Sequence, residues 1–208
     1  RSLVISDWFY SLSHTIKRNR VVTVVYALIC LLFLVVGIAV GITVSDKIEY
    51  VTRNGAVIFK YLRGDIGIVT FFFFDFGLTV VYCLFAASMF FNKALAFLSL
   101  APCAYRSYVL GMNTSIIIIV YSVSAIPMLF VLFVPMCIIE ITLLCMLSFR
   151  CFKFNAMNGS CMPSKTDVIV YYKGTLQYIF VLAVCMLAKS ITVVLFGSAL
   201  IGIVGGVA

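Results

Sequence analysis

Charged residues are scarce in this sequence, and their scarcity decides the class of protein. Asp, Glu, Lys and Arg make up 11% of the 208 residues, whereas 64% are hydrophobic and the mean hydropathy is +1.22. A soluble globule needs far more polar residues to cover its surface. The composition therefore predicts a membrane protein with room for about five spans of roughly 20 residues each. No soluble domain of ordinary size fits.

Histidine is nearly absent, and no catalytic or metal-binding signature stands in its place. His14 is the only histidine, on the polar side of an amphipathic N-terminal stretch. The sequence contains no P-loop, nucleophile elbow, H-E-x-x-H motif or paired metal spacing. The eight cysteines include no C-x-x-C pair and lie mostly in apolar runs, so we interpret them as free thiols. We expect no metal, no cofactor and no enzymatic activity.

The basic residues are arranged as topology signals. The net charge is +8, but the Lys and Arg residues form short clusters at the ends of apolar runs, which argues against a nucleic-acid partner. With the N-terminus in the cytoplasm, most of them fall on the cytoplasmic side, including Arg106. Lys189 belongs to the minority placed outside. We therefore predict a multi-pass protein of the inner (cytoplasmic) membrane.

The apolar runs divide the chain into one membrane domain, 1–208, an all-α helical bundle. Stretches too short or too polar to cross separate about five transmembrane helices. The expected segments are an interfacial helix 1–20, a first span 21–44, an outer amphipathic segment 45–65, a second span 66–92, a cytoplasmic-side interfacial helix 93–106, a third span 107–124, a fourth span 126–149, a cytoplasmic loop 150–169, a fifth span 170–189 and an apolar tail 190–208. The tail could lie in the interface, re-enter the membrane or cross it a sixth time.

Two carboxylates fall inside predicted spans. A charged side chain at bilayer depth costs several kcal/mol, so Asp75 and Glu140 must be neutral, paired or turned toward a polar interior. Each is about nine residues from one end of its span, at similar depth, and Asn113 lies at a depth suited to Glu140. They are candidates for a proton or cation relay or for hydrogen bonds between helices, and we favour the structural role.

Glycines suggest where helices approach closely. Gly37 and Gly41 form a G-x-x-x-G pattern in the first span. Small residues at this spacing let two helix backbones come together. We expect packing within the chain, with homodimerisation as the alternative use.

Two stretches resemble the stage II sporulation protein M family. From Pro102 the chain reads P-C-A-Y-R-S-Y-V-L-G-M, which is similar to the family's proline, basic residue, aromatic and glycine at the entry to a span, here with Arg106 and Gly111. The stretch from Pro135 to Glu140 matches the spacing of its P-H-G-x-x-E motif. Met and Cys replace the histidine and glycine of that motif, so chemistry attributed to that histidine cannot operate here.

The resemblance implies an integral scaffold that positions cell-wall hydrolases during sporulation, with catalysis carried by the hydrolases. Our leading hypothesis is accordingly a non-enzymatic scaffold whose partners are the lipid bilayer, membrane or envelope proteins and, as an open alternative, further copies of the chain. The competing hypothesis is a small transporter or channel subunit that uses Asp75 and Glu140. A third and weaker one is a viral or organellar protein that remodels membranes.

Overall fold

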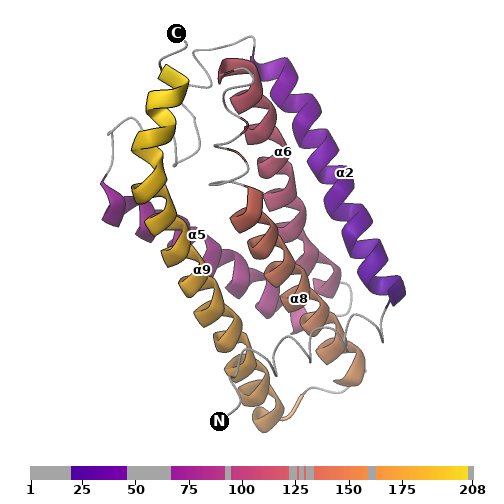
Figure 1. The fold of residues 1–208 in the computed structure, drawn as a ribbon. Helices are drawn as coiled ribbons and strands as arrows, with labels where there is room; N and C mark the ends of the chain where they lie inside the picture. The colour runs from indigo at the N-terminus through magenta and orange to yellow at the C-terminus, as the bar shows by residue number, and fades with distance from the viewer. Residues whose placement is uncertain are drawn as a thin grey trace.

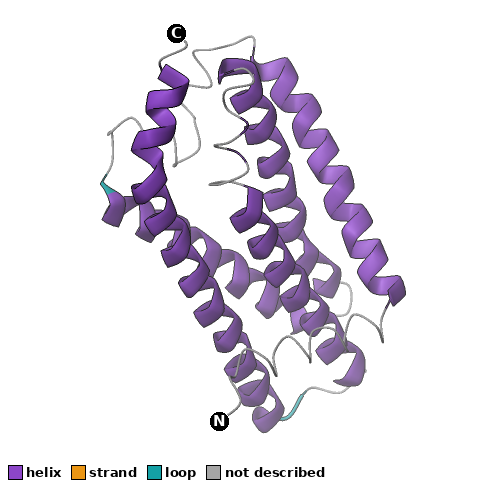
Figure 2. Cartoon of the chain, viewed as in Figure 1, coloured by secondary structure: helices purple, strands orange, loops and turns teal. Residues whose placement is uncertain are grey.

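The protein forms a bundle of helices (Figures 1 and 2). The structure, a computed structural model, describes residues 20–45, 67–91, 95–121, 134–158 and 163–205, together with Ile126 and Leu129. The expected interfacial helix 1–20 and outer segment 45–65 lie almost wholly outside these residues. The described elements are α2 (Arg20–Ser45), α5 (Ile68–Ser88), the 3-10 turns η1 (Met89–Phe91) and η2 (Leu95–Leu100), α6 (Ala101–Tyr121), α8 (Val134–Asn158) and α9 (Lys165–Gly205).

The predicted all-α class is confirmed for the part of the chain that the structure describes. Three stretches of the described helices are long and apolar enough to cross a membrane, namely Val21–Val44, Ile68–Ser88 and Lys165–Thr192. The chain is therefore a membrane protein by helix length and composition. α6 is not among these three, since Arg106, Asn113 and several hydroxyl-bearing residues lower its hydropathy, and α8 is not among them either.

Two prolines lie in the first turns of helices. α6 begins at Ala101 with Pro102 in its first turn, inside the segment 93–106 that we had expected to form a separate interfacial helix. α8 begins at Val134 with Pro135 in its first turn. The first turn tolerates proline because its N–H groups have no partner within the helix. Each proline thus starts a helix.

Helix α8 continues to Asn158, so the expected cytoplasmic loop 150–169 is shorter than predicted. α9 then starts at Lys165, and the preceding Ser164 explains why. The Asp167 backbone N–H donates to Ser164 Oγ at 3.2 Å, and Ser164 Oγ donates to the Asp167 carboxylate at 2.6 Å. A serine in this position satisfies a backbone donor that the first turn of a helix leaves free.

The C-terminal region is one helix where the sequence suggested a span and a tail. α9 has 41 residues and unites the expected fifth span 170–189 with the tail 190–208 as far as Gly205. At ~1.5 Å per residue its length is about 62 Å, roughly twice the hydrocarbon thickness of a bilayer. A helix of this length must extend beyond the core or tilt strongly.

Helix α2 packs against α6 through glycines. A Cβ atom on Gly37 would overlap the carbonyl of Tyr108, and one on Gly41 would overlap Ser115 Oγ. On α6, a Cβ on Gly111 would overlap the backbone of α2. The backbones are therefore in close contact. The contact of Gly37 with Tyr108 is followed on both helices by that of Gly41 with Ser115, and α2 and α6 run parallel (Figure 1).

Helix α2 also contacts α8, which runs antiparallel to it. Cys30 Sγ lies 3.6 Å from Cys145 Sγ, and the rings of Tyr26 and Phe149 meet edge to face at 6.5 Å. The two contacts are one turn apart on each helix and in reverse order, so α2 and α8 are antiparallel. Most of the remaining surface of α2 is exposed and apolar, as expected where lipid is the solvent.

The core lies between the other helices. α5, η1, α6, α8 and α9 supply one cluster of buried side chains, made of Cys83, Ala86, Ala87, Phe90, Cys103, Leu143, Leu144, Leu147, Cys151, Tyr171 and Leu182. Side chains also close the C-terminal end of α5. The Tyr171 hydroxyl donates to the Ala87 carbonyl at 3.1 Å, and Asn155 Nδ2 donates to the Phe90 carbonyl at 2.7 Å. These bonds join α9 to α5 and α8 to η1, which directly follows α5.

Candidate functional site

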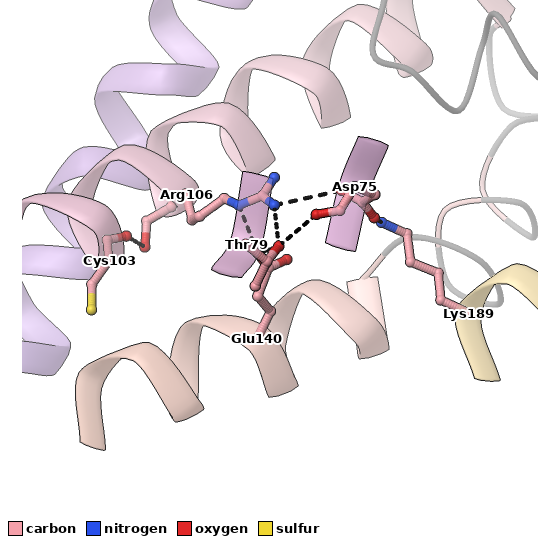
Figure 3. A network of polar contacts seen from close by, with 7 residues as sticks. Asp75, Thr79, Cys103, Arg106, Glu140 and Lys189 are labelled. Atoms are coloured by element: carbon pink, nitrogen blue, oxygen red, sulfur yellow. Dashed lines mark hydrogen bonds and ion pairs between the residues drawn. The ribbon is translucent and has the colours of Figure 1, made fainter. Parts of the chain in front are cut away.

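Four helices bring charged side chains together inside the bundle. Asp75 and Thr79 come from α5, Arg106 from α6, Glu140 from α8 and Lys189 from α9 (Figure 3). We call these five residues the ion-pair cluster. Each of the four helices supplies one charge, and two carboxylates face two cations, so the formal charges of the four groups cancel.

Asp75 and Thr79 are one turn apart on α5 and therefore lie on the same face. The Thr79 hydroxyl is 2.9 Å from the Asp75 carbonyl and 2.9 Å from Glu140 Oε1, and it accepts a hydrogen bond from Arg106 Nη2 at 2.8 Å. A hydroxyl has one proton, so it can serve only one of the two acceptors at a time. Thr79 thus links α5 to both α6 and α8.

Arg106 is the centre of the cluster. Its Nε lies 2.7 Å from Glu140 Oε1, and its Nη2 lies 3.5 Å from Asp75 Oδ1. The contact with Glu140 is an ion pair in which the N–H is not aligned as a hydrogen bond. The guanidinium also lies 5.2 Å from the ring centre of Tyr82, within the range of a cation–π interaction. Arg106 therefore holds both carboxylates from one side chain.

Lys189 joins α9 to the cluster. Its Nζ forms an ion pair and hydrogen bond with Asp75 Oδ2, and it lies 5.8 Å from the ring centre of Phe71. The residue is 7% exposed, and Glu140 is 3% exposed. Charges buried to this degree are costly unless paired, and removing one partner leaves the other uncompensated. The mutual pairing is what permits four charges at this position.

The structure brings Asp75 and Glu140 into one cluster, bridged by Arg106 and Thr79. Asn113 lies elsewhere: it is buried on α6, two turns beyond Arg106, and takes no part in the contacts that define the cluster. Gly111 lies at the interface with α2.

The two stretches that carry the family resemblance meet in space. Pro102 begins α6 and Arg106 follows one turn later, while Pro135 begins α8 and Glu140 follows just over one turn later. The ion pair between Arg106 and Glu140 joins the starts of the two helices. In both stretches a proline lies in the first turn of a helix and a charged residue follows four or five positions later. There the charged side chain contacts its counter-ion.

The topology assignment of two bases was wrong. Counting basic residues placed Arg106 and Lys189 on opposite sides of the membrane, yet both contact Asp75. A signal for Lys189 was present, because it is the only charged residue of α9 after Lys173 and interrupts a long apolar run. Two carboxylates within apolar helices also require counter-ions, and these two bases are available on neighbouring helices.

The charged groups of the cluster pair with one another across four helices. Among the described residues, no three His, Cys, Asp or Glu side chains lie close enough to share a metal ion. Both carboxylates are already occupied by cations of the same chain. No protein-family model, curated protein or solved structure matches the chain.

Proposed function

We propose that this chain is a non-enzymatic scaffold of the inner membrane that crosses the bilayer about five times, with its N-terminus in the cytoplasm. The observation that carries the proposal is the ion-pair cluster, in which each charge comes from a different helix and is compensated within the chain. Such pairing ties α5, α6, α8 and α9 into one body. A fixed bundle of this kind can present its non-spanning segments to partner proteins.

The length and burial of α6 and α8 support their assignment as the third and fourth crossings, in addition to the three apolar helices. α6 has 21 residues and α8 has 25, about 31 and 37 Å at ~1.5 Å per residue, enough for a core of roughly 30 Å. Their charges near the cluster, Arg106 and Glu140, face the bundle and are paired. Hydropathy alone therefore underestimates how well these helices fit a membrane.

The directions of the helices support five successive crossings. If α2, α5, α6, α8 and α9 cross in turn, α2 must be parallel to α6 and antiparallel to α8, as their contacts show. α6 and α8 must be antiparallel, and the pairs Cys103–Ser148 and Arg106–Glu140 do follow in reverse order.

The remaining pairs follow the same rule. α5 and α8, the second and fourth crossings, are parallel because Thr79 contacts Glu140 and the later Phe90 contacts Asn155. α5 and α9, the second and fifth, are antiparallel: Ala87 meets Tyr171, whereas the earlier Asp75 meets Lys189.

The topology is tested with reporters fused after Ala208. Five crossings from a cytoplasmic N-terminus put that end outside, so alkaline phosphatase fused there should be active and green fluorescent protein should be dark. The reverse result would contradict either the number of crossings or the orientation.

We assign partner binding to the expected outer amphipathic segment 45–65, because the apolar tail 190–208 continues α9 as far as Gly205. By the resemblance to the sporulation family, the partners are envelope proteins of the cell-wall hydrolase class. The test is affinity capture of the intact protein in mild detergent, with the co-purifying proteins identified by mass spectrometry. Reversing the four bases of the outer segment, Lys47, Arg53, Lys60 and Arg63, should abolish capture.

The matched control reverses Lys153, Lys165 and Lys173, exposed bases on α8 and α9 that are remote in sequence from the cluster residues. Capture should survive this change. Equal recovery of partners from the outer-segment variant and the parent would refute the assignment.

The second candidate function is a small transporter or channel subunit. The observation that favours it is the sharing of Asp75 between two cations, because Arg106 and Lys189 could exchange at this carboxylate when a solute passes. Reconstitution into vesicles decides the matter. Flux that disappears in both Asp75→Asn and Glu140→Gln supports transport, and an absence of flux from the parent supports the scaffold.

A further inference from the structure

The depth of α9 in the membrane is not determined by its apolarity. The helix has 41 residues and is about twice as long as the bilayer core is thick. A hydrophobic stretch longer than the core can tilt or shift, so several positions along its axis are available. Something else must select which residues lie in the hydrocarbon.

Lys189 distinguishes two of these positions. On an isolated helix its ammonium group would extend to the lipid headgroups, as long basic side chains do near membrane interfaces. That position corresponds to a span of 170–189, the one expected from the sequence. In the structure, Lys189 turns to the bundle interior and pairs with Asp75, and its neighbours Met186 and Ser190 are buried as well.

We propose that the ion pair between Asp75 and Lys189 is a lock that fixes the depth of α9 in the bilayer. Without Asp75, the ammonium group gains by moving to the headgroups and draws the helix along its axis. With Asp75 present, the charge is satisfied inside the bundle. The lock rests on the proposed membrane-spanning arrangement of α5 and α9, and it adds what determines the position of α9.

The geometry assigns the lock to Asp75 and not to Glu140. Lys189 hydrogen-bonds to Asp75, whereas Glu140 is held by Arg106 and by the Thr79 hydroxyl. Neutralising Glu140 therefore leaves the pair with Lys189 intact. This gives a matched control within the same cluster.

The cytoplasmic half of α9 has a separate attachment. Arg150 Nη2 donates to the carbonyl of Tyr171 at 3.3 Å, and the Tyr171 hydroxyl donates to the Ala87 carbonyl. Tyr171 and Lys189 are about five turns apart, roughly 27 Å along the helix. This second attachment keeps α9 in place when neither member of the lock is charged, so removing both charges should leave the depth unchanged.

The experiment measures the depth of a tryptophan on α9 by quenching with lipids brominated at different positions of the acyl chain. Trp8 is the only tryptophan of the chain, so a Trp8→Phe, Phe180→Trp protein carries a single reporter on a side chain that is 70% exposed. Asp75→Asn, Glu140→Gln and the double variant Asp75→Asn, Lys189→Gln are made in this background. All are compared with the reporter protein itself.

The lock predicts that Asp75→Asn moves the reporter along the bilayer normal by about one helical turn, ~5 Å, or more. Glu140→Gln and the double variant should keep the parent depth. An unchanged depth in Asp75→Asn overturns the lock. If no brominated lipid quenches the reporter in the parent, α9 does not lie in the bilayer and the proposed architecture itself fails.

Should Asp75→Asn not accumulate in the membrane, the exchange Asp75→Lys, Lys189→Asp decides the question. This variant restores opposite charges at the same two positions, and it is made together with Arg106→Gln and Glu140→Gln, so that the new ammonium group does not face the guanidinium that lies 3.5 Å from Asp75 Oδ1. The lock predicts the parent depth for it, and a displaced reporter overturns the proposal.

Discussion

Helix α6 is held on its two sides by different means, and the comparison shows two ways to join helices in lipid. On the side that faces α2, Gly111 of α6 packs against the backbone of α2, and Gly37 and Gly41 of α2 pack against α6. The helices are in close contact there without charged side chains. Toward α5 and α8 it offers Arg106, which pairs with Asp75 and Glu140. Apolar side chains gain little by leaving lipid for one another, so close packing and polar contacts must do the joining.

The two interfaces should respond differently to mutation. The glycine interface depends on shape, so it should be sensitive to added volume and indifferent to charge. The ion-pair cluster depends on balance, so losing one charge should cost more than losing a complementary pair. The following substitutions test this difference, beginning with the largest expected effect.

Replacing Arg106 with Met should cost the most. The change leaves Glu140 buried without a cation, and breaking a buried pair in this way typically costs about 3–5 kcal/mol. Unfolding of the purified protein in mixed micelles by added SDS measures the loss. The double variant Arg106→Met, Glu140→Met removes both charges and should recover most of the stability. A double variant as unstable as the single one would contradict the role of charge balance.

Substituting Gly111 with Ala should have the next largest effect. The added Cβ overlaps the carbonyl of Leu34 and approaches the amide of Ile38, and neither backbone atom can move aside cheaply. Overpacking of this kind costs about 1–3 kcal/mol. The contact between Cys30 and Cys145 reports the position of α2, since their sulfurs lie 3.6 Å apart. Oxidative cross-linking of this pair, identified by mass spectrometry, should fall in the variant.

The control for that substitution is Gly77→Ala on α5. A Cβ there meets no atom within 4 Å. Alanine favours the helix over glycine by about 1 kcal/mol, so stability should stay equal or rise. A loss of stability equal to that of Gly111→Ala would mean that glycine is required for reasons other than close packing.

Much of the fold could be predicted because a long apolar run in the sequence corresponds to a helix whose side chains face lipid. The first span 21–44 and the helix α2 (Arg20–Ser45) nearly coincide, since no charge interrupts the run. The start of α6 was missed because the segment 93–106, which contains Pro102, was expected to form a separate interfacial helix. Proline is compatible with either end of a helix in a sequence, and only the packing of the chain decides between them.

Two of the four charged residues of the cluster could be predicted from the sequence. Asp75 and Glu140 stood out because acids in apolar runs need partners. Their partners were missed because Arg106 and Lys189 lie near the ends of the expected spans, where bases normally mark the membrane surface. Contacts between distant helices depend on helix direction and rotation, which a single sequence does not record. The rule that each buried charge needs an opposite one would have recovered the four-residue set.

The smallest effect is expected for Thr79→Val, which removes a hydroxyl and keeps the shape and the charges. Arg106 and Glu140 lose one hydrogen bond each through Thr79, while their direct ion pair remains. Hydrogen bonds between membrane helices average only about 0.6 kcal/mol, because the alternative states find partners as well. SDS unfolding should therefore show a loss of about 1 kcal/mol, well below that of Arg106→Met. A loss as large as that of Arg106→Met would show that the hydroxyl, and not charge pairing, holds α5 to α6 and α8. The two sides of α6 would then differ by close packing on one side and a hydrogen-bonded hydroxyl group on the other.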